Sequence, residues 1–229
     1  MQKEILPLQG FKPVSQHITG LGPIDHAFQT RSFPLGAVHE FICQNPEGSA
    51  ATGGFITGLL SLLMHTGGVS LWIGTSPMVF APSLKYFGVE PDKIIFIRVQ
   101  KEKDVWWCME EALKCEGLVA VIGEIKELSF TASRRFQLAV EQSGVTGFAI
   151  RNNSGKPGTN ACLTRWQITS LPSIAGHQMP GVGFPRWNVE LLKVRNGKPG
   201  SWQIEYIDGQ FRFMTHVVPL VHAQQRKTG

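Results

Sequence analysis

Cysteine is scarce in this sequence, and its spacing does not suggest a disulfide framework or a zinc site. The chain of 229 residues contains no C-x-x-C pair, so its cysteines indicate reduced residues of the core. Its seven histidines are scattered, and His39-Glu40 is followed by Cys43 where a zinc-protease helix needs a second histidine. We therefore expect no metal site. The four cysteines are Cys43, Cys108, Cys115 and Cys162.

Long apolar runs are also missing. Residues 1–10 contain no apolar stretch typical of a secretion signal, and no window approaches the roughly 18 apolar residues that a membrane span needs. The sequence therefore predicts a cytoplasmic protein without membrane contact.

Charge is sparse and is not concentrated in blocks. Charged residues make up 17% of the chain and hydrophobic residues 42%, which favours one globular domain with a buried core over a disordered chain. The net charge is +5 and the pI is near 9.1, but there is no basic arm. The charge therefore indicates acidic or nucleic-acid partners only weakly.

A phosphate-binding loop is present in outline but lacks its chemistry. In residues 38–64 an apolar strand is followed by a glycine-rich stretch and an apolar helix, and Gly48 and Gly53 have the glycine spacing of G-x-x-x-x-G-K-[ST]. Gly54 and Phe55 then replace the lysine and the hydroxyl that bind phosphate and Mg²⁺. We predict a degenerate loop made of structural glycines, with no cofactor and with Phe55 buried. Weak anion or nucleotide binding by its backbone N–H groups is the open alternative.

The remaining pattern predicts an α/β fold, with a doubly wound, mostly parallel sheet and right-handed crossovers. We expect strands at residues 38–43, 69–74, 94–99, 118–122 and 146–151, and helices at residues 55–65, 81–87, 105–115 and 130–142. Asp104 is the predicted N-cap of the third helix. Strands at residues 161–169, 188–195, 201–208 and 210–214 should extend the sheet as antiparallel hairpins.

Three segments are expected along the chain. Residues 1–17 form an N-terminal arm, residues 18–215 form the domain, and residues 216–229 form a basic C-terminal tail. The glycine-rich and proline-rich residues 172–185 predict a long surface loop inside the domain.

Several segments resemble the RecA family between residues 18 and 207, namely ITGLGPIDHAF with FPLGAVHEF, and GTNACLTRWQI. The closer resemblance is to the RecA-like ImuA family. It is carried by FPLGAVHEF, DVWWCMEEAL before GLVAVIGEI, RRFQLAVEQSG before GFAIR, and WNVELLKVRNGKPGSW. That resemblance implies a RecA-like fold and an accessory role in SOS-linked translesion DNA synthesis. Its implied partners are a polymerase-like ImuB-type subunit and an error-prone DNA polymerase, with DNA as a candidate ligand within the complex.

The departures from RecA argue against ATPase activity. Thr75-Ser76-Pro77 stand where RecA has its catalytic glutamate, and Gly123-Glu124 stand where a Walker B aspartate would be. Glu124 could be a displaced metal ligand, but without a hydroxyl at position 55 this interpretation is disfavoured. The regions that correspond to the RecA DNA-binding loops are also short, which makes a DNA filament doubtful.

A protein that keeps such a fold without its chemistry is most simply a scaffold that acts through protein contacts. The alternatives are an ATP-dependent, recombinase-like DNA-binding protein and a cell-division inhibitor resembling SulA, a related RecA-like protein. The partner-binding candidates are Ile5 and Leu8, which could add a strand to a partner sheet, and Trp106 and Trp107, which cannot both face the same side of a helix. The possible DNA contacts are Arg134, Arg135, Arg151 and Lys156, with Arg165 close to them.

Overall fold

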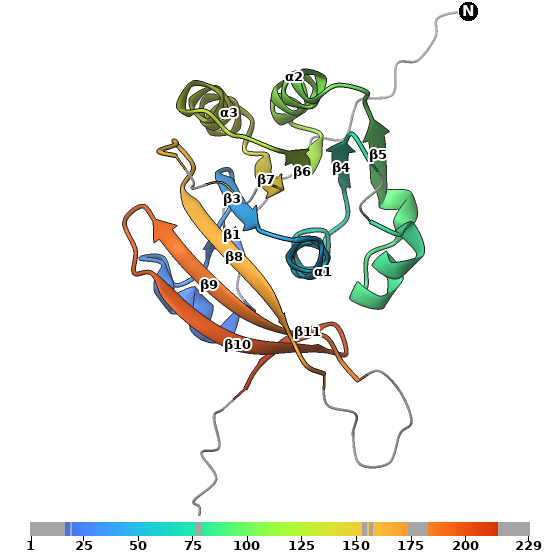
Figure 1. The fold of residues 1–229 in the computed structure, drawn as a ribbon, viewed down its shortest axis with the longest axis vertical. Coiled ribbons are helices and arrows are strands. Elements are labelled where there is room, and N and C mark those ends of the chain that lie inside the picture. Colours follow the sequence, from blue (N-terminus) through green and yellow to red (C-terminus); the bar gives the residue numbers. More distant parts are fainter. Residues whose placement is uncertain are drawn as a thin grey trace, which may run out of the picture.

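The computed structural model describes residues 17–18, 20–76, 79–152, 155, 158–173 and 183–214. A short ladder pairs β1 (His17–Ile18) with β2 (Phe33–Pro34). The main sheet has nine strands (Figure 1). They are β3 (Val38–Cys43), β4 (Val69–Gly74), β5 (Ile94–Arg98), β6 (Leu118–Ile125), β7 (Thr146–Asn152), β8 (Thr164–Leu171), β9 (Arg186–Val194), β10 (Gly200–Ile207) and β11 (Gln210–Phe213).

The sheet order is β11-β10-β9-β8-β3-β7-β6-β4-β5. The six strands from β8 to β5 in this order are parallel, and β9, β10 and β11 continue the sheet as antiparallel neighbours. The turn between β10 and β11 consists of Asp208 and Gly209, both with positive φ (52° and 75°), as a two-residue hairpin turn requires. The predicted C-terminal extension is therefore confirmed.

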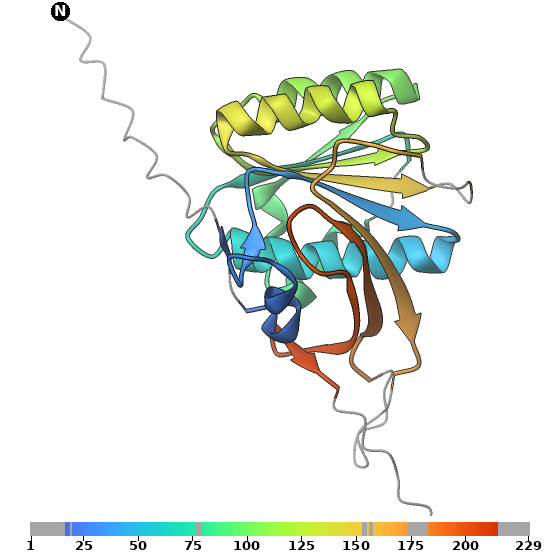
Figure 2. The same cartoon turned by 90° about the vertical axis from the view of Figure 1, so that its left-hand side faces the viewer.

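Helices cover both faces of the parallel strands, as the doubly wound prediction requires (Figure 2). One face carries α1 (Pro46–Leu63), and the other carries α2 (Glu102–Leu113) and α3 (Phe130–Ser143). The 3-10 helices are η1 (Gly22–Ala27), η2 (Ala81–Phe87) and η3 (Pro91–Lys93). In the described part of the chain, no helix combines the length and the hydropathy needed to cross a membrane.

The sheet separates two hydrophobic clusters. On the α1 face the C-terminal strands curve around the helix, so that α1 lies between the parallel strands and β9 to β11 (Figure 1). On the other face, Val105 and Met109 of α2 and Phe136 of α3 pack onto the sheet. All six residues of β3 are buried, including the polar side chains of His39 and Glu40, as expected for a central strand that is covered on both faces.

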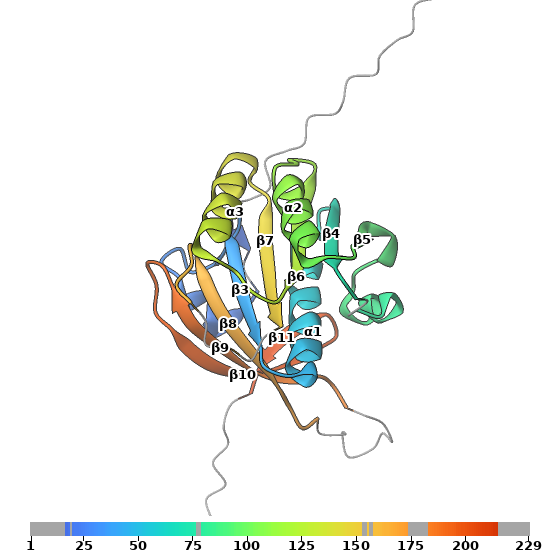
Figure 3. The ribbon, with the colours of Figure 1, turned by 45° about the horizontal axis from the view of Figure 1, so that its top comes forward.

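The strand at the free edge has little cover. Helix α2 packs on β6 and β4, and α3 packs on β3 and β7, so neither helix lies over β5 (Figure 3). Ile95, which points to that face, is 49% exposed, and Phe96, which points to the opposite face and contacts Trp72, is 43% exposed. The strand predicted at residues 94–99 is therefore present, and it lies at the end of the sheet.

Two predicted boundaries were wrong in ways that concern the site. Strand β6 extends to Ile125, three residues beyond the predicted end, so Glu124 lies in the strand. Helix α2 begins at Glu102 and has Lys101 in the extended N-cap conformation. Asp104 therefore lies within the first turn, where its carboxylate favours the positive end of the helix dipole, and it is not the cap.

Candidate functional site

The end of β3 is the position where a nucleotide-binding fold would place its phosphate loop, and here it holds no loop. Strand β3 ends at Cys43 and α1 begins at Pro46, so the predicted glycine-rich turn was wrong and residues 46–54 are helical. Asn45 caps the helix, and its Oδ1 accepts a 2.7 Å hydrogen bond from the N–H of Gly48. The signal for this early start is Asn45-Pro46-Glu47, an N-cap followed by a proline and an acidic residue in the first turn.

The first turn of α1 offers little to a phosphate. Pro46 has no N–H group, and the N–H of Gly48 is already donated to Asn45. The N–H of Ser49 donates to the carbonyl oxygen of Asn45 at 3.0 Å. Glu47 adds a negative charge at this end and is hydrogen-bonded to the Ser170 hydroxyl. An anion would therefore meet a carboxylate and one remaining N–H group, that of Glu47.

The glycines of this segment allow close packing. A Cβ on Gly54 would lie 3.0 Å from the ring of Trp187 and 3.2 Å from that of Phe87. A Cβ on Gly58, one turn later, would lie 2.6 Å from the ring of Phe211. Gly53 has more room, since its nearest neighbour would be Val79 at 3.8 Å. The glycines after residue 53 thus let the aromatic residues of the C-terminal strands approach the helix.

Phe55 is fully buried, as predicted. Its ring lies 5.4 Å from Phe211, 6.1 Å from Trp187 and 6.2 Å from Phe41, measured between centroids. It therefore lies in the core between α1 and the curved sheet. In a phosphate-binding loop the residue at this position would bind Mg²⁺ through a hydroxyl, and a phenyl ring has none.

A cavity of about 620 Å³ opens beside the start of α1, at the carboxyl ends of β3, β4 and β6. This end of a parallel sheet is where α/β proteins commonly bind ligands. Ser49 of α1 lines the cavity, and its hydroxyl donates a 2.8 Å hydrogen bond to Oδ1 of Asn152 at the end of β7. Thr75 and Ser76, which follow β4, line the opposite side.

Glu124 supplies the acidic group of this cavity. Its side chain is buried, and Oε1 accepts a 2.5 Å hydrogen bond from the indole Nε1 of Trp72. Burial raises the pKa of Glu124 to about 7, although the hydrogen bond from Trp72 acts in the opposite direction. Burial likewise raises the pKa of the neighbouring Cys43 thiol, which donates to Oγ1 of Thr52 at 3.3 Å. A buried carboxylate with such a shift in a cavity marks a candidate binding site.

The described residues do not bring together a metal-binding set. No group of three or more His, Cys, Asp or Glu side chains is arranged to hold an ion in this part of the chain. Gly123, at the predicted Walker B position, packs against α2, because a Cβ there would lie 2.4 Å from Sδ of Met109.

The partner-binding candidates are placed differently from one another. Trp106 is half-buried and packs against the α2 cluster, whereas Trp107 is 65% exposed. The two rings therefore face different directions, as the helical spacing predicts. Ile5 and Leu8 lie outside the described residues. Ile95 and Phe96 could not be singled out from the sequence, because an edge strand and a buried strand can have the same apolar pattern.

The basic candidates within the described residues do not form one surface. Arg134 is exposed, and Arg135 is paired with Glu110 of α2 at 2.7 Å. Lys156 lies outside the described residues. Arg151 is buried, with its guanidinium 3.7 Å from Oε1 of Glu40, so it is not available to DNA.

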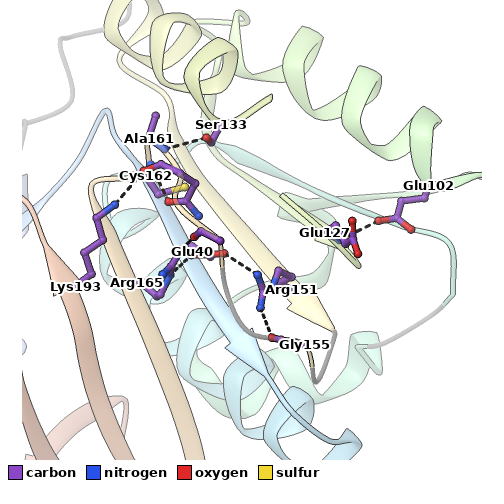
Figure 4. Close-up of polar contacts among 12 residues, drawn as sticks. Glu40, Glu102, Glu127, Ser133, Arg151, Gly155, Ala161, Cys162, Arg165 and Lys193 are labelled. Atoms are coloured by element: carbon purple, nitrogen blue, oxygen red, sulfur yellow. Dashed lines mark hydrogen bonds and ion pairs between the residues drawn. The ribbon is translucent and has the colours of Figure 1, made fainter. Parts of the chain in front are cut away.

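Glu40 holds two arginines on neighbouring strands (Figure 4). Its side chain is fully buried, and Oε2 accepts a hydrogen bond from Nε of Arg165. Arg151 also donates to the carbonyl oxygen of Gly155 at 2.9 Å, and Arg165 donates to that of Gly158 at 2.6 Å. The network therefore ties β3, β7 and β8 to the connection between β7 and β8, which explains the burial of these charges.

No protein-family model matches the chain. It is similar to Protein ImuA from two strains of Caulobacter vibrioides. Each is 33% identical over 194 residues, and the match covers 80% of this chain and 80% of the relative.

Proposed function

Because the chain belongs to the ImuA family, we propose that it is a non-catalytic accessory protein of SOS-linked, error-prone translesion DNA synthesis. It acts through protein contacts, and its partners are a polymerase-like ImuB-type subunit and an error-prone DNA polymerase. DNA is reached through the complex and not by a filament of this chain.

The observation that supports this proposal is the direct passage from β3 into α1. A phosphoryl-transfer site needs backbone N–H groups, a cation and a metal to stabilise the charge of the transferred phosphoryl group. Here Pro46, the Asn45 cap and the Glu47 carboxylate occupy the place of that site, and Phe55 lies in the core. A protein of this family without these elements is better suited to binding than to turnover.

Two exposed apolar features are the surfaces that we propose for the partner. Trp107 is exposed on α2, and tryptophan is enriched among the residues that dominate binding energy. Ile95 and Phe96 are exposed on β5, and none of the described strands pairs with its outer edge, so a partner strand can add there. An apolar edge of this kind in a monomer would favour aggregation, so a partner that covers it is a physical advantage.

Co-expression with the ImuB-type subunit of the same organism tests the proposal. We expect a stable complex in size-exclusion chromatography and measurable affinity in calorimetry. Trp107→Ala and Ile95→Lys should each weaken the affinity by about tenfold or more. The matched control is Phe130→Ala, which truncates an aromatic residue that is 56% exposed on α3 and should leave the affinity unchanged.

A different outcome would assign a different function. The scaffold proposal fails if the two folded proteins do not associate while this chain alone binds single-stranded DNA cooperatively and hydrolyses ATP. That result would favour the recombinase-like alternative.

A further inference from the structure

Glu124 is a buried carboxylate to which the described residues supply no cation. Its side chain is 6% exposed, and it lines the cavity at the carboxyl ends of β3, β4 and β6. Trp72 donates to Oε1, and no hydrogen bond from a described residue reaches Oε2, which is not among the fully buried atoms left without a partner. Oε2 lies over Gly74, since a Cβ there would come within 2.7 Å of it. A carboxylate that is buried without a counter-charge is costly, which makes its retention inside a cavity a sign of a ligand.

The cavity is unfavourable for an anion. At the start of α1, Pro46 has no N–H group, and the N–H of Gly48 is already donated to the side chain of Asn45. Above its pKa of about 7, Glu124 adds a negative charge to the lining of this cavity. The cation among the lining residues is Lys126, whose side chain is exposed and forms no ion pair with Glu124. A phosphate in this cavity would therefore lie close to a carboxylate, with few donors to compensate.

From these contacts we infer that the cavity binds a guanidinium or ammonium group, with Glu124 as its counter-ion. Such a group brings the two things that Glu124 lacks, namely N–H donors for Oε2 and a positive charge. A charge-assisted hydrogen bond in a partly buried site is also stronger than one in water. One carboxylate with few fixed oxygen neighbours is a poor site for Mg²⁺ or Ca²⁺, which need about six or more oxygen ligands.

This group can be carried by a side chain of a partner polypeptide or by a free small molecule. The site belongs to this chain alone, so the inference stands or falls independently of the proposed partnership. Failure of the ImuB-type subunit to associate would leave it untouched, and absence of cation binding would leave the partnership experiment valid.

Titration with n-butylguanidinium chloride, at constant ionic strength kept with sodium chloride, tests the inference. The reporter is the indole N–H signal of Trp72 in an NMR spectrum of the labelled full-length protein, assigned with Trp72→Phe. We expect a saturable shift of this signal. Glu124→Gln keeps an acceptor for Trp72 but removes the charge, and it should weaken binding by about tenfold or more.

A second variant keeps the test valid if Glu124→Gln fails to fold. Ala50 is exposed on α1 and lines the same cavity, so Ala50→Phe narrows the cavity and leaves Glu124 in place. It should also abolish the saturable shift. A blocked Gly-Arg-Gly peptide identifies the source of the group, since tighter binding than n-butylguanidinium indicates a polypeptide and equal binding indicates a free small molecule.

Three results would overturn the inference. The first is the absence of a saturable shift with both probes. The second is unchanged affinity in Glu124→Gln and Ala50→Phe. The third is a saturable shift with sodium pyrophosphate or magnesium chloride in place of the guanidinium, which would assign the cavity to an anion or a metal.

Discussion

Trp72 and Glu124, on neighbouring parallel strands, are joined by a 2.5 Å hydrogen bond from the indole Nε1 to Oε1. The bond fixes the carboxylate at the floor of the cavity beside α1, where burial raises its pKa to about 7 from the ordinary value of 4.5. A carboxylate at the carboxyl end of a parallel strand can hold a metal ion when further oxygen ligands, such as a hydroxyl, lie beside it. Here position 55 has a phenyl ring and no hydroxyl, so the carboxylate of Glu124 is available to a different ligand.

The raised pKa of Glu124 predicts a loss of stability as pH rises. Below 4.5 the group is protonated in both the folded and the unfolded chain, and it has no effect. Between 4.5 and about 7 the unfolded chain releases the proton first, so the free energy of unfolding falls. Relative to the wild type, Glu124→Gln should gain up to about 3 kcal/mol between about pH 4 and about pH 8. Urea unfolding of both proteins across this range measures the difference.

His39 changes the stability with pH in the opposite direction to Glu124, but its effect is the same in the wild type and in Glu124→Gln. Burial lowers the pKa of His39 to about 3, against a weaker opposing effect of its hydrogen bond to Pro34. Its contribution to stability is therefore lost as pH falls below 6.5, the ordinary value. Both proteins share this term, so it cancels in the difference. Parallel pH profiles for the wild type and Glu124→Gln would contradict the prediction.

Gly53 and Gly58 should respond in opposite directions to alanine substitution. Glycine in a helix is less favourable than alanine by about 1 kcal/mol, and Gly53 has room for a Cβ, so Gly53→Ala should stabilise by up to that amount. At Gly58 the Cβ would lie 2.6 Å from the ring of Phe211, so Gly58→Ala should destabilise by about 1 to 3 kcal/mol. Thermal unfolding of the two variants measures both. A loss of stability in Gly53→Ala would indicate that this segment is a loop.

The segment from β3 to α1 also shows where prediction from the sequence succeeds and where it fails. The bounds of β3 and β4 were predicted correctly, because both strands are mostly apolar and each is followed by residues typical of turns. The glycine spacing of residues 48–53 instead suggested a loop, although Asn45-Pro46 already contained the local signal for a helix start. The capping residues, and not the glycine spacing, therefore determine where α1 begins.

The candidate site could be predicted only in part. Phe55 was identified as buried, because a phenyl ring in place of a metal-binding hydroxyl must pack elsewhere. Arg151 is a possible DNA contact by sequence, and its pairing with Glu40 could not be predicted, because the two residues are 111 positions apart and leave no local pattern. The exposure of Ile95 could not be predicted for the same reason. Strand order depends on pairing between distant segments, and this pairing places β5 at the edge of the sheet.

Phe55→Ala should destabilise the protein by about 3 to 5 kcal/mol, because it removes a fully buried ring from an aromatic cluster and leaves a cavity. Phe55→Lys should be at least as damaging, since it buries a charge without a partner, and it should not restore nucleotide binding. The control is Phe130→Ala on the surface of α3, expected within about 0.5 kcal/mol of the wild type. Urea unfolding measures all three. An unchanged melting temperature in Phe55→Lys would contradict the assignment of this residue to the core.

Glu40→Gln should cost about 3 to 5 kcal/mol, because it leaves the buried guanidinium groups of Arg151 and Arg165 without their counter-charge. Glu110→Gln is the matched control. It removes the partner of Arg135, which is 62% exposed at its side chain, and should cost less than about 1 kcal/mol. Chemical unfolding gives both values. The described part of the β7–β8 connection should also lose protection in Glu40→Gln, because the two arginines bind the carbonyl groups of Gly155 and Gly158. Hydrogen exchange at residues 158–160 detects this change. Equal costs for the two variants, with unchanged exchange, would mean that the Glu40 network does not hold the connection in place.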